Sequence, residues 1–377
     1  MAKSKQFAPH VISEVAVASV GTALLLCAVL ANQRWLDRHF FPSWFLPHQW
    51  WVLIESSVRA MLAAIGVSLA LWMRPRLGRF IASTPTLVVQ LAVAALLAFG
   101  AGELVLRHMQ LRPVGWLVPA EEPRRRGDPR LGWTLVPART GHTTVGARVI
   151  DYAIDPAGYR VRRVDEPVDP ERPTILFIGE SVMFGQGLRW EESVPAQVGA
   201  MMGIQSANLA VHGYSSDQAY LRLETELPRF RQPVAVVSLF MTALFGRNLD
   251  DNRPHLGPGL IWLPTQQHGR LASLVKLLVP YRKTDTVERG ITVTRQVLGA
   301  TVNLARARGA TSLIVVPQFG VEAQAERALR RRILDETGLP YVWIEIDEGW
   351  RLSGDLHPNP RAAHAIATAV ATRLRGR

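Results

Sequence analysis

Long apolar segments dominate the first third of the chain. Val15 to Ala31 carries no charged residue, Thr84 to Gly102 is a second uncharged run, and Trp50 to Met73 is apolar apart from one glutamate and one arginine. A hydrocarbon core about 30 Å thick needs roughly 20 helical residues, and each run approaches that length when its flanks are included. The pattern predicts a membrane region over residues 1–112 with three spans, at about 11–31, 50–73 and 84–106.

Two features of this region leave alternatives open. Glu55 and Arg59 lie four residues apart, so on a helix they share a face and could pair with each other or with a neighbouring helix. If this middle run only lay on the surface, the chain would cross the membrane twice. The first run could instead be a cleavable signal peptide, with Lys3 and Lys5 as its basic start and a small-residue site ending at Ala31. The two later runs favour a retained span, and both interpretations hold the protein at a membrane.

Short apolar runs of strand type alternate with helical patterns over residues 166–377. The predicted strands are Thr174–Ile178, Ile204–Leu209, Val234–Phe240, Ser312–Val316 and Tyr341–Ile346. The predicted helices are Glu191–Met202, Asp217–Leu227, Thr286–Arg308, Glu322–Glu336 and Pro360–Arg373. This alternation predicts an α/β domain with a parallel sheet covered by helices on both faces. Arg247 to Asp285 has no clear period and is expected to be a long excursion over the site.

A shorter segment, residues 113–165, connects these two regions. Residues 113–130 are rich in proline, arginine and glycine, which is typical of a linker. Leu131 to Arg163 contains short β-like runs, with a turn signal at Asp155 to Gly158. We expect a linker followed by a small β-rich collar that packs on the α/β domain.

Charge and cysteine content exclude several classes of protein. The net charge is +12, and one basic cluster, Arg124 to Arg126, follows the last predicted span, where anionic lipid head groups would attract it. No basic, aromatic-interleaved module occurs, so we expect no nucleic-acid partner. Cys27 is the single cysteine, which excludes an intramolecular disulfide and a cysteine-based metal site.

Loop charges and aromatic residues set the expected orientation in the membrane. If the N-terminus is in the cytoplasm, five basic residues near the spans are cytoplasmic: Lys3, Lys5, Arg74, Arg76 and Arg79. Four then lie outside: Arg34, Arg38, Arg107 and Arg112. The Trp- and Phe-rich loop from Trp35 to Trp51 is typical of an interfacial belt and suits the side with few cations. Three spans then place the C-terminal domain outside the cytoplasm.

Candidate chemistry gathers at the predicted strand ends, where sites form in parallel sheets. Ser181 follows the first strand, Gly213 the second, and Thr242 to Asn248 the third. A serine nucleophile needs a base, usually histidine, and a third group that orients the base. We identify Ser181 as the candidate nucleophile, His357 as the base and Asp355 as the orienting carboxylate. The backbone amides of Ser181 and Gly213 are candidate donors to the developing oxyanion.

Three short blocks occur in a recognisable order. They are Gly179-Glu180-Ser181 with Gly185, the segment Asn208 to Ser215 that contains Gly213, and His357-Pro358-Asn359. On these blocks the chain resembles the SGNH, or GDSL-type, hydrolase superfamily over roughly residues 130–377. The resemblance implies a flavodoxin-like parallel sheet sandwiched by helices, an acyl-enzyme on Ser181, and an oxyanion hole that includes Gly213.

The chain departs from the family pattern in three places. Glu180 stands where the family usually has aspartate, one methylene shorter. Asp355 lies two residues before His357, where most members have three. The alginate O-acetyltransferase-like branch has the shorter spacing, but there the pair precedes the serine, whereas here the serine comes first, as in the esterases. Asn248 is the nearest candidate for the asparagine that completes the oxyanion hole, with Thr242 as a substitute. Loss of one such donor costs about 10²- to 10³-fold in turnover.

The other titratable residues are assigned structural roles. His212 and His364 are expected to pack or cap rather than act as bases. Asp250, Asp251 and Asp355 lack the tight spacing of a metal site, so we expect no metal and no cofactor.

These observations favour a membrane-anchored serine esterase or O-acyltransferase. The resemblance and the membrane region imply a bacterial inner (cell) membrane protein acting on cell-envelope or exported glycans or lipid-linked esters, with possible envelope protein partners. The alternative is a catalytically idle SGNH domain that binds glycan or assembles an envelope complex. A transporter is disfavoured, because the spans hold few polar groups.

Overall fold

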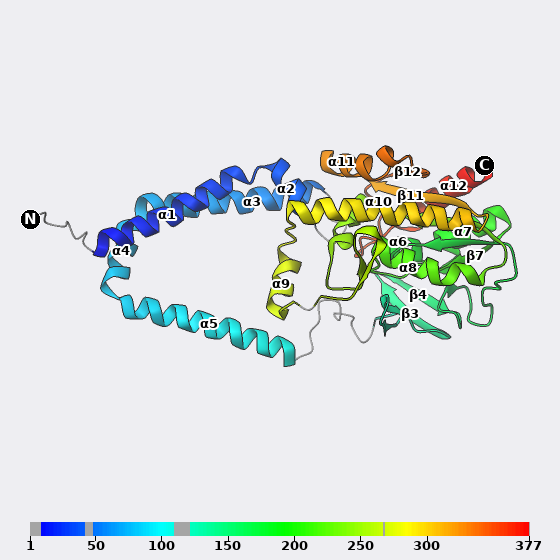
Figure 1. Ribbon diagram of the computed structural model, residues 1–377, viewed down its shortest axis with the longest axis horizontal. Helices are drawn as coiled ribbons and strands as arrows, with labels where there is room; N and C mark the ends of the chain where they lie inside the picture. The colour runs from blue at the N-terminus through cyan, green and yellow to red at the C-terminus, as the bar shows by residue number, and fades with distance from the viewer. Residues whose placement is uncertain (1–8, 42–47, 109–120, 267, 377) are drawn as a thin grey trace, which may run out of the picture. The chain divides into compact units, whose positions relative to one another are not determined.

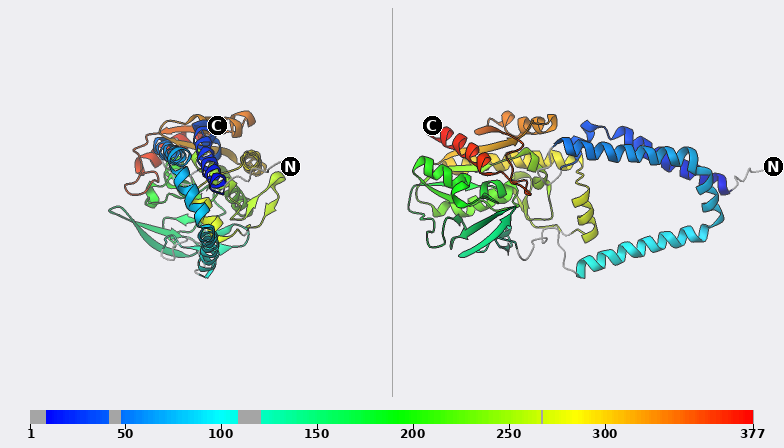
Figure 2. Two further views of the ribbon diagram at one scale, coloured as in Figure 1. Left: turned by 90° about the vertical axis from the view of Figure 1, so that its left-hand side faces the viewer. Right: turned by 180° about the vertical axis from the view of Figure 1, so that it is seen from behind.

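A computed structural model describes residues 9–41, 48–108, 121–266 and 268–376 of the chain. The chain divides into two compact units (Figures 1 and 2). The first comprises residues 1–40, 48–112 and 269–279, and the second comprises residues 41–47, 113–268 and 280–377. Each unit is described separately below.

The first unit is helical and contains the apolar segments. Its helices are α1 (Pro9–Leu30), α2 (Gln33–His39), α3 (His48–Val67), α4 (Arg74–Ser83), α5 (Pro85–His108) and α9 (Arg270–Leu278), and a π-helical turn over Ser68–Met73 joins α3 to α4. By length and composition, three helical stretches in the described part of the chain could cross a membrane: His10–Leu30, Gln49–Ser83 and Pro85–His108. The three predicted apolar segments are therefore helices of sufficient length.

The middle stretch is longer than the sequence pattern predicts, since it continues through Pro75 to Ser83. Its 35 residues extend about 52 Å at about 1.5 Å per residue, more than the roughly 30 Å of a hydrocarbon core. A proline lacks the amide hydrogen that a helix interior needs and clashes with the carbonyl four residues earlier. The wide π-turn ends at Met73, two residues before Pro75, and accommodates the proline, so the helix continues past it.

Helices α1 and α3 lie side by side (Figures 1 and 2) and approach closely at two glycines. A Cβ on Gly66 would lie 2.8 Å from the carbonyl oxygen of Gly21. Small residues permit such approach of helices in membranes. The two charged residues of α3 are directed at neighbouring segments: Glu55 accepts from Gln33 Nε2 over 2.7 Å, and Arg59 Nε donates to Ala28 O over 3.0 Å.

Helix α9 comes from the aperiodic excursion and packs against α5 within the first unit. Glu103 of α5 accepts the backbone amides of Arg270 and Leu271 over 2.8 and 2.7 Å, which satisfies free donors at the start of α9. The excursion therefore contains a helix that the sequence pattern did not predict.

The second unit is built on an eight-stranded sheet with the order β12-β11-β8-β6-β7-β5-β4-β3. Its parallel strands are β6 (Thr174–Ile178), β7 (Gln205–Asn208), β8 (Pro233–Leu239), β11 (Thr311–Phe319) and β12 (Tyr341–Ile346). Numbered by their order in the chain, the five run 5-4-3-1-2, which is the flavodoxin-like order. The five predicted strands and the predicted fold class are confirmed.

Helices cover both faces of this sheet (Figures 1 and 2). The main helices are α7 (Val194–Met202), α8 (Ser216–Glu226), α10 (Thr284–Ala307), α11 (Gln324–Ile333) and α12 (Pro360–Arg375). Helix α10 packs with α8 and α11 on one face, and α12 packs with α7 on the other. The shorter elements are α6 (Ser181–Phe184), the β9–β10 hairpin (His255–Leu256 and Trp262–Leu263) and single 3₁₀ segments, including Thr242–Leu249.

The β-rich collar continues the main sheet. Strand β4 (Arg148–Ile154) pairs antiparallel with β3 (Arg139–Val145) and with β5 (Arg160–Val161), and β5 pairs with β7 through Arg160 and Asn208. A separate hairpin, β1 (Arg125–Asp128) and β2 (Gly132–Leu135), precedes them. Buried residues of the collar, such as Tyr152 and Trp133, belong to the same apolar core as the strands of the parallel sheet.

Candidate active site

Ser181 lies on a tight turn after the central strand β6. The turn begins at Gly179, whose φ of 148° disfavours other residues, and a Cβ there would lie only 2.8 Å from Leu239 Cβ. Glu180 is the N-cap of α6, and Ser181 is the first residue of that helix. The serine is 2% exposed. Its backbone amide is thus at a helix N-terminus, where an anion is stabilised.

A continuous chain of hydrogen bonds joins the three predicted catalytic side chains. Ser181 Oγ lies 2.8 Å from His357 Nε2, although the two residues are 176 positions apart in the chain. His357 Nδ1 lies 2.5 Å from Asp355 Oδ1. This geometry allows His357 to remove the serine proton while Asp355 orients the imidazole.

The short spacing between Asp355 and His357 is compatible with this geometry. The backbone amide of His357 donates to Asp355 Oδ1 over 3.0 Å, so the same oxygen meets both the main chain and the ring of the residue two positions later. Such a local turn is typical of aspartate. The sequence Pro358-Asn359-Pro360 then starts α12, with Asn359 Oδ1 accepting from the amide of Ala362 over 3.0 Å.

Asp355 is held in its ionised form. Burial alone would raise the pKa of its carboxyl group, but the hydrogen bond and charge of His357, with backbone donors, bring the pKa below its ordinary value of 3.8. An ionised Asp355 accepts the Nδ1 hydrogen of the His357 ring, so that Nε2 is the ring nitrogen that faces Ser181 Oγ.

Glu180 contacts the nucleophile directly. Its Oε2 lies 2.5 Å from Ser181 Oγ and 3.0 Å from Arg247 Nη1, while Oε1 accepts the amide of Val182 over 3.2 Å. The extra methylene relative to aspartate is therefore accommodated, and the carboxylate both caps α6 and pairs with Arg247. The serine hydroxyl has one hydrogen and lies between two acceptors, Glu180 and His357, so it can donate to only one of them at a time.

The predicted oxyanion residues differ in their placement. Gly213 follows β7 and has a φ of 81°, in the left-handed region that favours glycine. Among the described residues, no hydrogen-bond acceptor is paired with the backbone amides of Ser181 or Gly213. Both amides therefore remain candidate donors.

Asn248 requires a correction. It lies in the 3₁₀ segment after β8, where its Nδ2 donates to Ser216 Oγ over 3.1 Å and to Thr294 Oγ1 over 3.0 Å. Its Oδ1 accepts the amide of Ser216 over 2.9 Å. Both amide hydrogens are thus used in joining this segment to α8 and α10, and Asn248 does not present a donor to an oxyanion in this conformation. Thr242 is buried at the start of the same segment.

Arg160 is a site residue that the sequence did not reveal. Its guanidinium is fully buried between the rings of Tyr152 and Phe184, 4.8 and 4.9 Å away. It donates to the carbonyls of Phe184, Gly185 and Leu188 over 2.6, 2.7 and 2.6 Å, on the turn that follows Ser181. Burial lowers its pKa to about 10, so it is a cation at neutral pH. No sequence motif marks it, because its role depends on the β5–β7 pairing.

His212 and His364, the two histidines expected to pack or cap, contact neighbouring side chains. His212 is buried, its ring meets Phe184 edge-on at 5.8 Å, and its Nε2 lies 3.3 Å from Glu121 Oε1. Burial lowers the pKa of His212, against the opposing effect of Glu121. His364 Nδ1 lies 2.6 Å from Gln197 Oε1.

Asp250 and Asp251, which the sequence analysis did not assign to a metal site, pair with basic residues. Asp250 pairs with Arg253 and Arg282, and Asp251 Oδ1 lies 2.9 Å from His268 Nε2. Over residues 9–41, 48–108, 121–266 and 268–376, no group of three or more histidine, cysteine or acidic residues could hold a metal ion.

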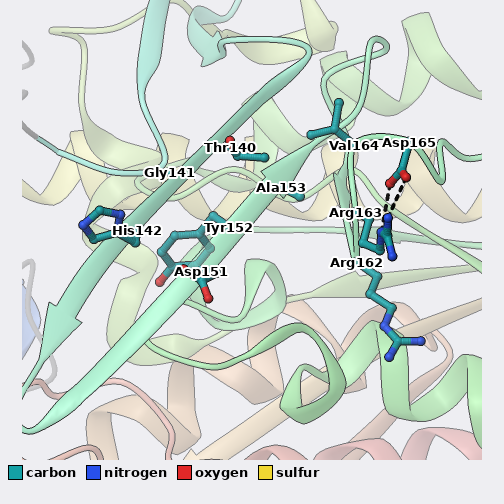
Figure 3. A pocket seen from close by; sticks show the side chains of 10 residues that line it. All are labelled: Thr140, Gly141, His142, Asp151, Tyr152, Ala153, Arg162, Arg163, Val164 and Asp165. Carbon is teal, nitrogen blue, oxygen red and sulfur yellow. Dashed lines mark hydrogen bonds and ion pairs between the residues drawn. The ribbon is translucent and has the colours of Figure 1, made fainter.

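A surface groove of about 670 Å³ lies along β3, β4 and residues 162–165 (Figure 3). Its three residues Arg162, Arg163 and Asp165 are paired, since Arg163 bonds Asp165 within the groove and Arg162 lies 3.1 Å from Glu191. The residues that line it include no member of the Ser181–His357–Asp355 triad. The groove is therefore a separate surface feature.

The chain resembles several solved structures. One is a protein from Desulfitobacterium hafniense described as lipolytic and of the G-D-S-L family, with 14% identity and a TM-score of 0.36, covering 53% of this chain and 98% of that one. An acetyl xylan esterase from Butyrivibrio proteoclasticus has 10% identity and a TM-score of 0.34, covering 56% and 65%. A carbohydrate acetylesterase from Sinorhizobium meliloti has 10% identity and a TM-score of 0.33, covering 54% and 99%.

No family model and no curated protein sequence matches the chain. The functional conclusion therefore depends on the side chains around Ser181.

Proposed function

We propose that the protein is a membrane-anchored serine esterase or O-acyltransferase that forms an acyl-enzyme on Ser181. The observation that carries this proposal is the unbroken Ser181–His357–Asp355 chain of hydrogen bonds, with distances of 2.8 and 2.5 Å. Nucleophile, base and orienting carboxylate within hydrogen-bond reach are the defining arrangement of serine acyl transfer.

The geometry leads to a two-step reaction. His357 Nε2 takes the proton of Ser181 Oγ as this oxygen attacks the ester carbonyl, and the amides of Ser181 and Gly213 stabilise the oxyanion. The resulting imidazolium, stabilised by Asp355, returns the proton to the leaving alcohol. His357 then activates an acceptor hydroxyl, which attacks the acyl-enzyme and releases Ser181. Water as acceptor gives hydrolysis, and a sugar hydroxyl gives O-acyl transfer.

We propose cell-envelope or exported glycans, or lipid-linked esters, as substrates. Three helices with the length and composition of membrane spans support anchoring in the inner (cell) membrane. The distribution of basic residues favours a catalytic domain outside the cytoplasm, where such esters occur and envelope proteins could be partners. A reporter fused after Arg377 tests the orientation. Activity of an exported reporter supports it, whereas activity of a cytoplasmic reporter alone would reverse it.

A second candidate function follows from Asn248. Because its amide is bound to Ser216 and Thr294, the predicted oxyanion donors that remain are the backbone amides of Ser181 and Gly213, with the Thr242 hydroxyl as the substitute. An idle SGNH domain that binds glycan or assembles an envelope complex would tolerate such a loss. The intact triad favours the enzyme.

Labelling with a fluorophosphonate probe distinguishes the two candidates. In detergent, the wild type is expected to be labelled, and Ser181→Ala and His357→Ala are expected to lose labelling while keeping the wild-type thermal midpoint. Absence of labelling in a folded wild type would favour the binding domain. With an activated acetyl ester and an added sugar, the products then separate the two activities: acetate indicates an esterase, and acetylated sugar indicates a transferase.

A further inference from the structure

We propose that Trp133 is a positioning residue that sets the direction of the Gly213 amide in the oxyanion hole. The inference rests on the proposed function, which assigns Gly213 the role of donor. The peptide concerned joins the carbonyl of His212 to the amide of Gly213. In a planar trans peptide the C=O and N–H bonds point in opposite directions, so a group that holds the carbonyl also aims the amide hydrogen.

Trp133 contacts this peptide in two ways. Its indole Nε1 donates to the carbonyl oxygen of His212 over 3.1 Å. Its ring also packs against the glycine, since a Cβ on Gly213 would lie 3.2 Å from Trp133 Cζ2. The hydrogen bond fixes the carbonyl, and the ring restricts rotation of the glycine next to it. The amide hydrogen of Gly213 therefore points away from the indole.

The indole itself has little freedom to move. Trp133 is 3% exposed, and the guanidinium groups of Arg125 and Arg253 lie 5.5 and 5.2 Å from its ring centre. Tyr214 meets the ring edge-on at 5.8 Å and donates its hydroxyl hydrogen to the carbonyl oxygen of Trp133 over 2.7 Å. These contacts hold the β2 strand against the loop that carries Gly213.

The peptide on the other side of Gly213 is held as well. Arg253 Nη1 donates to the carbonyl oxygen of Gly213 over 2.7 Å. A glycine has no Cβ to limit its conformations, so neighbours must supply this constraint. Since Asn248 is bound elsewhere, two backbone amides would have to stabilise the oxyanion, and the alignment of each matters more. An oxyanion donor contributes about 10²- to 10³-fold in turnover.

Trp133→Phe tests this role, because it keeps an aromatic ring and removes the indole N–H. Trp262→Phe is the matched control: its Nε1 also donates to a backbone carbonyl, that of Arg130, over 3.1 Å, but the residue is 41% exposed. With an activated acetyl ester, we expect kcat of Trp133→Phe to fall about 10- to 100-fold with KM within about twofold of the wild type. The rate of fluorophosphonate labelling should fall in parallel. Trp262→Phe should keep the wild-type values.

A second variant separates the hydrogen bond from packing. Replacement of Trp133 by 3-benzothienylalanine keeps the bicyclic shape without an N–H, and the same loss of kcat is expected at a wild-type thermal midpoint. A kcat within twofold of the wild type in this variant, or a raised KM with unchanged kcat, would overturn the positioning role. If the wild type neither turns over esters nor reacts with the probe, the proposed function fails and the inference fails with it. An active wild type with unchanged Trp133 variants overturns the inference alone.

Discussion

Replacing Arg160 by methionine is expected to loosen the turn that holds Ser181 in place. The guanidinium donates to three carbonyls of this turn and is stacked between Tyr152 and Phe184. Methionine has a similar length and fills much of the same space, but it can neither donate hydrogen bonds nor attract the rings as a cation. The change therefore tests the polar contacts with little loss of packing volume.

The expected loss of stability depends on which hydrogen bonds each of the three carbonyls keeps after the substitution. Phe184 O still accepts from Asn208 Nδ2 over 3.2 Å, and Gly185 O still accepts the amide of Leu188 over 3.1 Å. Leu188 O loses the one partner it has among the described residues. A buried acceptor left without a partner costs about 1–3 kcal/mol, and each cation–π contact contributes about 0.5–2 kcal/mol. Removing a buried charge offsets part of this loss. We expect a net destabilisation of about 2–4 kcal/mol.

Thermal unfolding of the detergent-solubilised protein, followed by tryptophan fluorescence, measures this effect. The expected fall in the midpoint is roughly 5–15 °C, with slower fluorophosphonate labelling below the transition. Arg162→Met is the control, because that side chain is 63% exposed and its ion pair is with Glu191 at the surface. The cost of this change should stay below about 0.5 kcal/mol. If Arg160→Met melted and reacted like Arg162→Met, the guanidinium would not be what holds the turn.

Three further predictions concern the triad, the oxyanion hole and the helical unit. Asp355→Asn should lower kcat about 10⁴-fold with the fold intact. Because the folded-state pKa of Asp355 is below 3.8, the stability that its carboxylate contributes is complete above that pH and is lost as the pH falls through the folded-state pKa. Acid unfolding of the wild type and of Asp355→Asn measures this difference. Asn248→Ala should cost about 1–2 kcal/mol of stability but change kcat less than about threefold, and a loss of about 10²-fold or more would restore Asn248 to the oxyanion hole. Gly66→Leu should reduce the yield of folded protein in detergent, whereas Gly100→Leu, with no atom within 4 Å of its Cβ position, should not; equal yields would argue against the close helix contact.

The parallel sheet could be predicted because four of its five strands are largely apolar runs, as expected for strands buried on both faces, whereas β7 (Gln-Ser-Ala-Asn) is mostly polar. Every residue of β6, for example, is buried. Ser181 and His357 could be found because each lies in a short motif beside an element boundary. Their contact, across 176 residues, then follows from the order of the strands.

Other features depend on long-range partners that leave no local signal. β5 has two residues, too few for a periodic pattern, so the continuity of the collar with the main sheet was not predictable. Trp133 and Arg160 act through hydrogen bonds to distant backbone carbonyls, which no side-chain pattern records. Asn248 has the right residue type after the right strand, yet Ser216 and Thr294 bind its amide.

The pairing of β5 with β7 determines where the α/β domain can be separated from the helical unit. A cut at residue 166, just before the first parallel strand, would remove Arg160 and Trp133 and leave β7 with an unpaired edge. Such a fragment would keep Ser181, His357 and Asp355 yet is expected to aggregate and to lose its activity. A soluble fragment should instead begin before Glu121 and replace residues 269–279, which belong to the helical unit, with a short polar linker.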